Sequence, residues 1–216
     1  MKIIEIDREW LEVLYPCETI TLSFLNHYQK ENGKGFYGKT EDLHKLIPFL
    51  STGTLHCCIS KAVRWEFLKL TGGRYDNRLH EIKAIDEYYA IPDYIFMSDK
   101  LSPLQKLIYA YIYTTHYINH NMSVTKEEIR KNLNIMKNRY FEKDLLWLVN
   151  HHFVVMINGA IFRTAPIPSE ESFIKLTDWH DRYQKKGKNK EKEKPVSPVK
   201  AFFIKIWNFI SRRKSK

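Results

Sequence analysis

Residues that could do chemistry are present, but their spacing completes none of the common sites. His116 and His120 stand four residues apart in a predicted helix, the spacing of two metal ligands on one face, yet no third ligand follows nearby. Cys57 has His56 as a neighbour, but adjacent residues of a helix do not face each other, which disfavours a nucleophile and its base. The glycines at 72–73 lack the phosphate-loop pattern. We therefore predict a protein that is not an enzyme and holds no metal ion or cofactor.

The charge is unevenly distributed along the 216 residues. Residues 1–182 carry 23 basic and 23 acidic side chains, whereas residues 183–216 carry 12 basic and 2 acidic ones. The net charge of +10 therefore lies in the C-terminal segment. Because the preceding part has no summed positive field, a uniformly basic nucleic-acid-coating protein is excluded, and any DNA affinity there must come from local patches.

Two features of the sequence indicate the compartment. The start, MKIIEIDREW, lacks the layout of a signal peptide, and no apolar run approaches the roughly 20 residues that a spanning helix needs. The cysteines at 17, 57 and 58 are too few and too awkwardly spaced for a disulfide framework. We expect a cytoplasmic protein with reduced cysteines.

The sequence contains an internal repeat. Displacing it by 86 residues aligns apolar positions with apolar positions and one glycine with another, for example Leu22 with Ile108, Leu43 with Ile129, Phe67 with Phe153 and Gly73 with Gly159. Within each copy the apolar spacing is helical over three segments and then strand-like. A duplicated unit of three helices followed by a hairpin is therefore predicted.

The first copy is predicted to form three helices and a hairpin, near residues 17–31, 40–47, 52–65 and 66–84. Pro48 ends the second helix, because a proline has no N–H and keeps the preceding residue out of the helical region. The turn sequence GGRYDN supplies glycines between the predicted strands Phe67–Leu70 and Glu81–Ile85.

The second copy is predicted to repeat this order, with three helices and a hairpin near residues 103–119, 125–132, 137–150 and 153–162. Thr125 and Glu128 have the spacing of a capping box at the start of the middle helix. Asn158-Gly159 is a strong hairpin signal. Three helices followed by a hairpin is the winged-helix arrangement, a variant of the helix-turn-helix.

Two stretches resemble the winged helix-turn-helix proteins of bacterial phages and plasmids that take part in replication. One is IPDYIFMSDKLSPLQKLIYAYIYTTH followed by VTKEEIRKNLNIMKNRYFEKDLLWLVNHHFVVMINGAIF. The other is FYGKTEDLHKLIPFLSTGTLHCCISKAVRWEFLKLTGG, which looks like the same module. The resemblance implies recognition helices near 51–65 and 137–150, with the hairpins as wings that reach toward a phosphate backbone.

Candidate DNA contacts come from both copies. The first recognition helix starts with hydroxyl residues that suit phosphate better than bases, whereas the second starts with basic and amide side chains. We therefore expect the second module to make the main contact. The candidates are Lys137, Asn138, Arg139, Tyr140, Lys143 and Arg163 in the second copy, and Ser51, Thr52, Thr54, Lys61, Arg64, Arg74 and Arg78 in the first.

Two other interpretations of these residues stay open. A basic residue on an exposed helix is often only a solvated side chain. A winged helix can also serve for protein contact alone, and Leu146 and Trp147 widen the apolar surface beyond what one small core needs. Trp147 could equally pack against residues 166–182.

The C-terminal segment is the other unusual feature. After a predicted helix near 169–183, the run KKGKNKEKEKPVSPV reads as a flexible basic linker that could bind nucleic acid nonspecifically. The following helical pattern is amphipathic and basic, so it could lie on an anionic membrane surface or dock on a protein. Its candidate contact residues are Phe202, Phe203, Ile206, Trp207, Phe209 and Ile210.

The sequence thus predicts a mainly α protein with small β-hairpins, an α+β fold of two tandem winged-helix modules and a C-terminal helical tail. The predicted divisions are 1–92 and 93–167 for the modules, then 168–183, 184–198 and 199–216. The expected function is non-enzymatic binding of double-stranded DNA by a protein of a bacterial mobile element, in replication initiation or its regulation. A homodimer is compatible with it. The alternative is a protein-binding adaptor or inhibitor that its terminal helix tethers to a partner or peripherally to a membrane.

Overall fold

The computed structural model describes residues 2–72, 78–83, 87–120, 124–136 and 139–164. Contacts within the chain divide it into two compact units, residues 1–167 and 168–216. All the described residues belong to the first unit. The predicted helical extension, basic linker and terminal amphipathic helix lie outside the described residues, as do the six apolar candidates of that helix.

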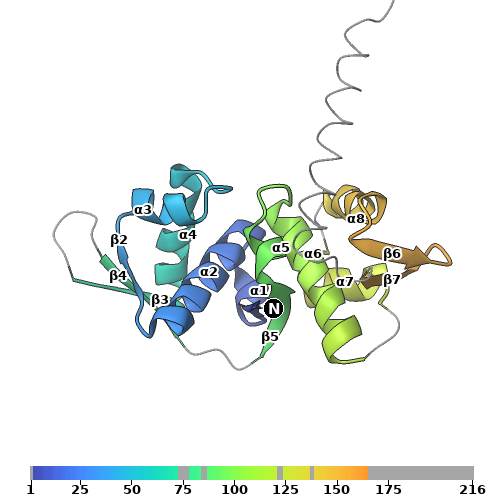
Figure 1. The fold of residues 1–216 in the computed structure, drawn as a ribbon, viewed down its shortest axis with the longest axis horizontal. Helices are drawn as coiled ribbons and strands as arrows, with labels where there is room; N and C mark the ends of the chain where they lie inside the picture. The colour runs from blue at the N-terminus through green and yellow to red at the C-terminus, as the bar shows by residue number, and fades with distance from the viewer. Residues whose placement is uncertain (1, 73–77, 84–86, 121–123, 137–138, 165–216) are drawn as a thin grey trace, which may run out of the picture. The chain divides into compact units, whose positions relative to one another are not determined.

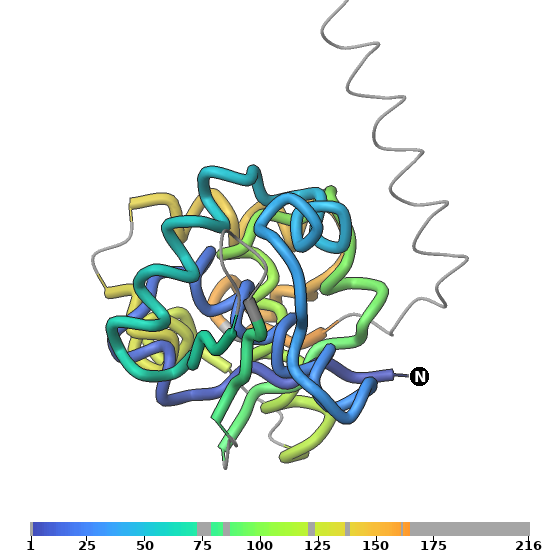
Figure 2. Tube along the Cα trace, turned by 90° about the vertical axis from the view of Figure 1, so that its left-hand side faces the viewer, coloured from blue at the N-terminus to red at the C-terminus, as the bar shows by residue number. Residues whose placement is uncertain are grey.

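The described part combines helices with small antiparallel sheets, which confirms the expected α+β class (Figure 1). The first half contains β1 (Ile3–Asp7), α1 (Trp10–Val13), α2 (Pro16–Asn32), β2 (Phe36–Gly38), α3 (Thr40–Leu46), α4 (Thr52–Arg64), β3 (Leu68–Thr71) and β4 (Arg78–Ile82). The second half contains β5 (Tyr88–Pro92), α5 (Asp93–Met97), α6 (Pro103–Tyr113), the π-helical turn η1 (Thr114–Ile118), α7 (Lys126–Asn132), α8 (Phe141–Asn150), β6 (Val154–Ile157) and β7 (Ile161–Thr164). Figure 2 follows the same path as a trace from the N-terminal strand to the last hairpin.

Most of the predicted helices lie where the sequence placed them. The three predicted helices of the first half, observed as α2, α3 and α4, end within one residue of their predicted limits. The second strand of the first hairpin begins at Arg78, three residues earlier than predicted. The short elements β1, α1, β2, β5 and α5 were not predicted.

Two sheets follow the same plan in the two halves. In the first half β4 lies between β3 and β2, and the short strand β2 pairs with β4. In the second half β6 pairs with β7, and a single bridge joins Val124 to Phe162 on β7. In both halves a segment between the first and second helices therefore pairs with the last strand of the hairpin.

Helix ends repeat at the displacement of 86 residues. Glu66 and His152, each just past the third helix of its half, have positive φ angles of 59° and 60°. At both ends the next amide donates to a carbonyl inside the helix, Phe67 to Ala62 and Phe153 to Leu148. This left-handed closure satisfies carbonyls that the helix leaves without partners. The backbone of the third helix therefore ends in the same way in both halves.

A third sheet lies between the first helices of the two halves. β1 pairs antiparallel with β5 over five residues. β1 packs against α2 and β5 against α6. The amide of Ala90 in β5 donates to the Thr114 hydroxyl, 2.6 Å away, at the start of η1. The buried apolar residues of this layer, Ile4, Ile6 and Ile91, are inaccessible to solvent, and each contributes roughly 1.5–3 kcal/mol by burial.

Candidate nucleic-acid interface

The outward side of α8 carries the main candidate residues. Phe141, Leu145 and Leu148 are buried against the core. Arg139, Tyr140 and Lys143 are exposed, and so are Leu146 and Asn150 further along the helix. Residues 137–138, which complete the predicted cluster, lie outside the described residues. The structure therefore brings together three of the predicted contacts at one end of α8.

The start of α8 differs from the prediction. The helix begins at Phe141 rather than near residue 137, and Arg139 and Tyr140 form a turn before it. Tyr140 stands at the N-cap position, where no side chain accepts a hydrogen bond from the helix. Instead Arg139 donates to the Tyr140 hydroxyl over 2.5 Å and its guanidinium lies 4.7 Å from the centre of that ring. The two side chains thus form one exposed unit.

An ion-pair network ties α7 to the start of α8. Lys126 Nζ lies 2.8 Å from Glu142 Oε2, and Arg130 Nη2 lies 3.1 Å from Oε1 of the same carboxylate. The hydrogen bond from Lys126, together with that from Arg130, lowers the pKa of Glu142. The Arg130 guanidinium also lies 4.2 Å from the centre of the Phe141 ring. Both cations neutralise the acid that precedes Lys143, a role that the sequence did not indicate.

The second acid of α8 is also engaged. Asp144 Oδ1 accepts a hydrogen bond from Gln105 Nε2 of α6 over 2.8 Å. Its partial burial raises the pKa of its carboxyl, against the effect of that hydrogen bond. Because Glu142 and Asp144 both have protein partners, Arg139 and Lys143 dominate the charge of the exposed turn.

The second hairpin carries its basic candidate, Arg163, on its last strand rather than at the turn. Asn158 and Gly159 have φ angles of 50° and 73°, as a tight hairpin turn of this composition requires. Arg163 lies on β7, half-buried and opposite Val155. Burial, and then the charge of Arg163, lowers the pKa of His116.

Hydroxyl residues cap α4, the predicted recognition helix of the first half. Ser51 Oγ accepts a hydrogen bond from the amide of Thr54 at 3.2 Å and lies 2.8 Å from the Thr54 hydroxyl. Thr52 is half-buried, and Arg64 is exposed at the last turn. The Ser51 hydroxyl, predicted to bind phosphate, is thus already engaged with the helix.

Lys61, a predicted DNA contact of α4, forms an ion pair with α2. Its Nζ lies 2.7 Å from Glu18 on α2 and 4.2 Å from the centre of the Tyr15 ring. The ion pair and the ring hold the ammonium back against α2, so Lys61 does not extend toward a ligand. Of the first wing's candidates, Arg74 lies outside the described residues, and Arg78 opens β4 with its side chain outside them.

A hollow of about 330 Å³ separates α4 from the wing in the first half. Its lining combines apolar residues with hydroxyls and imidazoles: Thr40, His56, Ile59, Ser60, Val63, Leu70 and His80. His80 is buried, and its Nδ1 lies 3.1 Å from the carbonyl oxygen of Phe36. Among the described residues, no acidic, lysine or arginine side chain lines the hollow.

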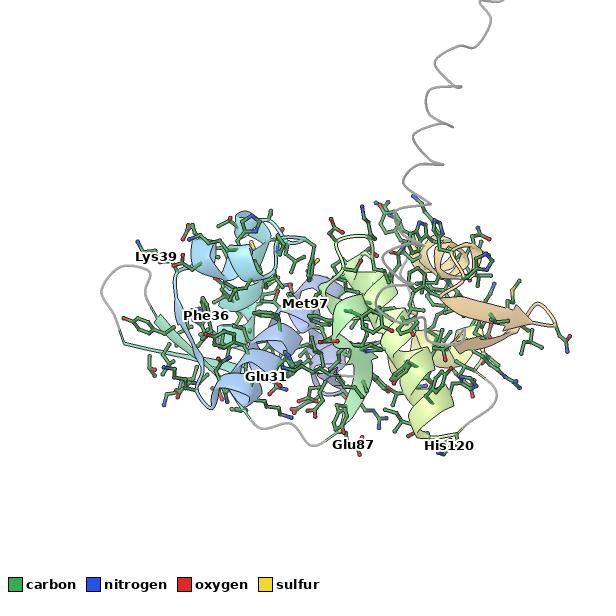
Figure 3. All side chains as sticks on the ribbon, in the orientation of Figure 1. Glu31, Phe36, Lys39, Glu87, Met97 and His120 are labelled. Atoms are coloured by element: carbon green, nitrogen blue, oxygen red, sulfur yellow. The ribbon has the colours of Figure 1, made fainter. Side chains whose placement is uncertain are left out.

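The residues considered for catalysis and metal binding are separated. His116 belongs to η1, where its Nδ1 lies 2.9 Å from the Thr164 hydroxyl, and His120, labelled in Figure 3, lies beyond that turn with a φ of 53°. In the described part of the chain no three metal-binding side chains gather. Burial raises the pKa of the Cys58 thiol to about 11, so this cysteine is protonated at neutral pH.

Comparison with family models, curated proteins and solved structures found no match to this chain. Among the described helices, none is both long enough and apolar enough to cross a membrane.

Proposed function

We propose that the chain is a non-enzymatic protein that binds double-stranded DNA through two winged-helix modules. The order of elements supports this proposal. Each half has a first helix, a short paired segment, two further helices and a hairpin, and the short segment pairs with the last strand of the hairpin. This order is that of winged-helix domains. A role in replication or its control on a bacterial mobile element rests on the sequence resemblance.

The contact is proposed to centre on α8, because its outward side joins exposed cations with an amide. Lys143 and Asn150 lie seven residues apart on this side, and Arg139 extends the row beyond the helix start. Such side chains bind phosphates and base edges when a recognition helix enters the major groove. This exposed row is the observation that carries the proposal.

The first module takes a smaller part in the proposal. Ser51 and Lys61 already have partners within the protein, whereas Arg64 is exposed at the last turn of α4. We expect this module to add phosphate contacts rather than base recognition.

The main test replaces both Arg139 and Lys143 by Ala. Duplex affinity, measured by fluorescence anisotropy on a short DNA over a series of salt concentrations, should fall by about 10- to 100-fold at moderate salt. The slope of log affinity against log salt should decrease by about 2, because two phosphate contacts are lost. A matched control removes the same charge at Lys34 and Lys100, which are exposed outside α8 and its turn. Equal loss in both variants would contradict a contact at α8.

The basic C-terminal segment must be separated from this contact. A chain that ends at Arg182 lacks 12 of the 35 basic residues. It should keep salt-sensitive duplex binding, with a smaller slope than the full chain. If the shortened chain has no such binding, the modules do not bind DNA and the proposal fails.

The apolar surface of the second module favours protein binding as a second candidate function. Leu146 is 47% exposed in the middle of α8, and Val155 and Met156 of β6 are 44% and 40% exposed. Replacing Leu146 by Asp separates the candidates. If the second module binds protein, Leu146→Asp should abolish self-association or partner binding. Replacing Arg139 and Lys143 by Ala should then leave this binding unchanged. Sedimentation of the full chain over a concentration series measures the self-association.

A further inference from the structure

Lys106 is buried in the second half without a hydrogen-bond partner. Its side chain, in the first turn of α6, has 0% solvent exposure, and its Nζ makes no hydrogen bond among the described residues. The Nζ lies 3.1 Å from the centre of the Phe49 ring and 5.6 Å from that of Phe96. An ammonium normally donates three hydrogen bonds. This amine donates none and lies on aromatic rings instead.

The position of Lys106 connects the two halves of the protein. Phe49 belongs to the turn between α3 and α4 in the first half, and Phe96 belongs to α5 in the second. The two rings meet edge to face with their centres 6.5 Å apart. Met97, labelled in Figure 3, follows Phe96 and is the last residue of α5. We call Lys106, Phe49 and Phe96 the lysine joint.

The joint fits a neutral amine better than an ammonium. Attraction between a cation and a ring returns only part of the hydration that a buried ammonium loses. Burial therefore lowers the pKa of Lys106 from 10.5 to about 7, and the charge of Asp99 opposes this only weakly. A hydrated lysine has a pKa near 10.4. Proton uptake thus favours arrangements in which the side chain leaves the joint.

The acids on the elements packed against α6 do not compensate this charge. Asp99, in the loop between α5 and α6, is exposed and makes no salt bridge to Lys106 among the described residues. Asp144 on α8 accepts a hydrogen bond from Gln105. Glu18 on α2 pairs with Lys61. Asp144 and Glu18 therefore each have a partner other than Lys106.

We infer that the lysine joint is a proton-dependent coupling between the two halves. When Lys106 takes up a proton, its side chain leaves the rings and releases Phe49 and the turn that leads into α4. Ser51, the N-cap of α4, is only two residues from Phe49, so the position of α4 relative to α8 changes with it. If both helices bind DNA as proposed, the joint controls the spacing of the two contacts.

The sign of the pH effect follows from linkage. Between about pH 7 and 10.5 the released side chain holds a proton that the closed joint lacks, so the ratio of closed to released molecules rises up to tenfold per pH unit. Below pH 7 both forms hold the proton and the ratio becomes constant. Between pH 7 and pH 9 the ratio should change by roughly 50-fold.

The experiment measures a distance between the halves of the full chain without DNA. Spin labels are placed at the exposed Cys57 on α4 and at a cysteine introduced by Glu127→Cys on α7, with Cys17→Ala and Cys58→Ala in the background. Distance distributions are recorded at pH 6, 7 and 9. The otherwise unchanged chain should gain a second population as pH falls from 9 to 7, with little further change at pH 6. Lys106→Met should keep one distribution at every pH.

Two further measurements keep the test decisive. Lys100→Met, at an exposed lysine, should respond to pH as the unchanged chain does. NMR titration of ¹³C-labelled lysine should find Lys106 with a pKa near 7, whether or not Lys106→Met folds. A pKa near 10.5, or the same pH response with and without Lys106, overturns the inference. Because no DNA is present, this outcome is independent of whether α8 binds a duplex.

Discussion

The surroundings of α4 in the first half and of α8 in the second half differ, although the two helices end in the same way. In the second half Lys126 and Glu142 form an ion pair between α7 and α8. The residues 86 positions earlier are Thr40 and His56, and they line the hollow of the first half. The helix closures at Glu66 and His152 are nevertheless alike. The two halves therefore share a helix end, and they differ in charge at the two positions compared.

The largest expected effect concerns a buried position that distinguishes the two first helices. Thr19 and Lys106 each stand four residues after the N-cap of their helix, and both are inaccessible to solvent. The Thr19 hydroxyl donates to the carbonyl of Tyr15, whereas the Lys106 amine donates to no group in the described part. Lys106→Met should raise the free energy of unfolding by about 2–4 kcal/mol at pH 7. Urea unfolding measures it.

The pH dependence of the same unfolding experiment provides the control. The unchanged chain should gain stability from about pH 7 toward 10.5, because the unfolded lysine is protonated over that range and the folded one is not. In Lys106→Met this gain should be absent. A gain of equal size in both proteins would assign it to other groups.

A smaller effect is expected at the caps of the middle helices. Thr125 Oγ1 accepts a hydrogen bond from the amide of Glu128 at 3.3 Å, whereas the equivalent residue of the first half, Lys39, makes no side-chain cap bond. Thr125→Ala should therefore cost about 1 kcal/mol, and Lys39→Ala close to zero. If urea unfolding showed the same loss of unfolding free energy in both variants, the two caps would contribute equally to stability.

The smallest effect should come from the exposed ion pair itself. Replacing Lys126 by Thr and Glu142 by His gives the second half the side chains of the first. The cost should be about 1 kcal/mol or less, since Glu142 is nearly half exposed and water screens the pair. The lowered pKa of Glu142 means that its contribution is present above about pH 4.5 and disappears as pH falls below it. A double variant that matches the unchanged chain from pH 4 to pH 7 would show that the pair does not stabilise the fold.

Local patterns predicted the parts of the fold that depend on nearby residues. The helices that end at Asn32 and Leu46 follow from apolar spacing and from Pro48, and the Asn158-Gly159 turn follows from its own composition. Strands β1 and β5 were missed because they pair across about 80 residues, and five-residue segments carry little pattern by themselves. The alternation in β1, with Ile4 and Ile6 buried around a half-buried Glu5, was a signal that could have indicated a strand.

The sequence could predict which basic residues of the candidate site are exposed, but not which of them form ion pairs within the protein. Exposure of Lys143 agrees with the helical period, whereas Arg139 and Tyr140 are exposed in a turn that precedes the helix. The pairing of Lys61 with Glu18, or of Arg130 with Glu142, depends on how helices far apart in the sequence lie together. Lys106 was missed because a lysine among apolar residues is normally assigned to the surface.

The β1–β5 sheet limits how the protein could be divided. A fragment that starts at residue 93 would lack β5, the strand that packs against α6. It would also lack the amide of Ala90, which donates a hydrogen bond to the Thr114 hydroxyl. Tyr89 and Ile91 would leave with that strand, and the inner side of α6 would meet water. Recombination or gene fission at this point would therefore yield two fragments with newly exposed apolar surface, rather than two independently folded domains. The two halves are therefore expected to be inherited together.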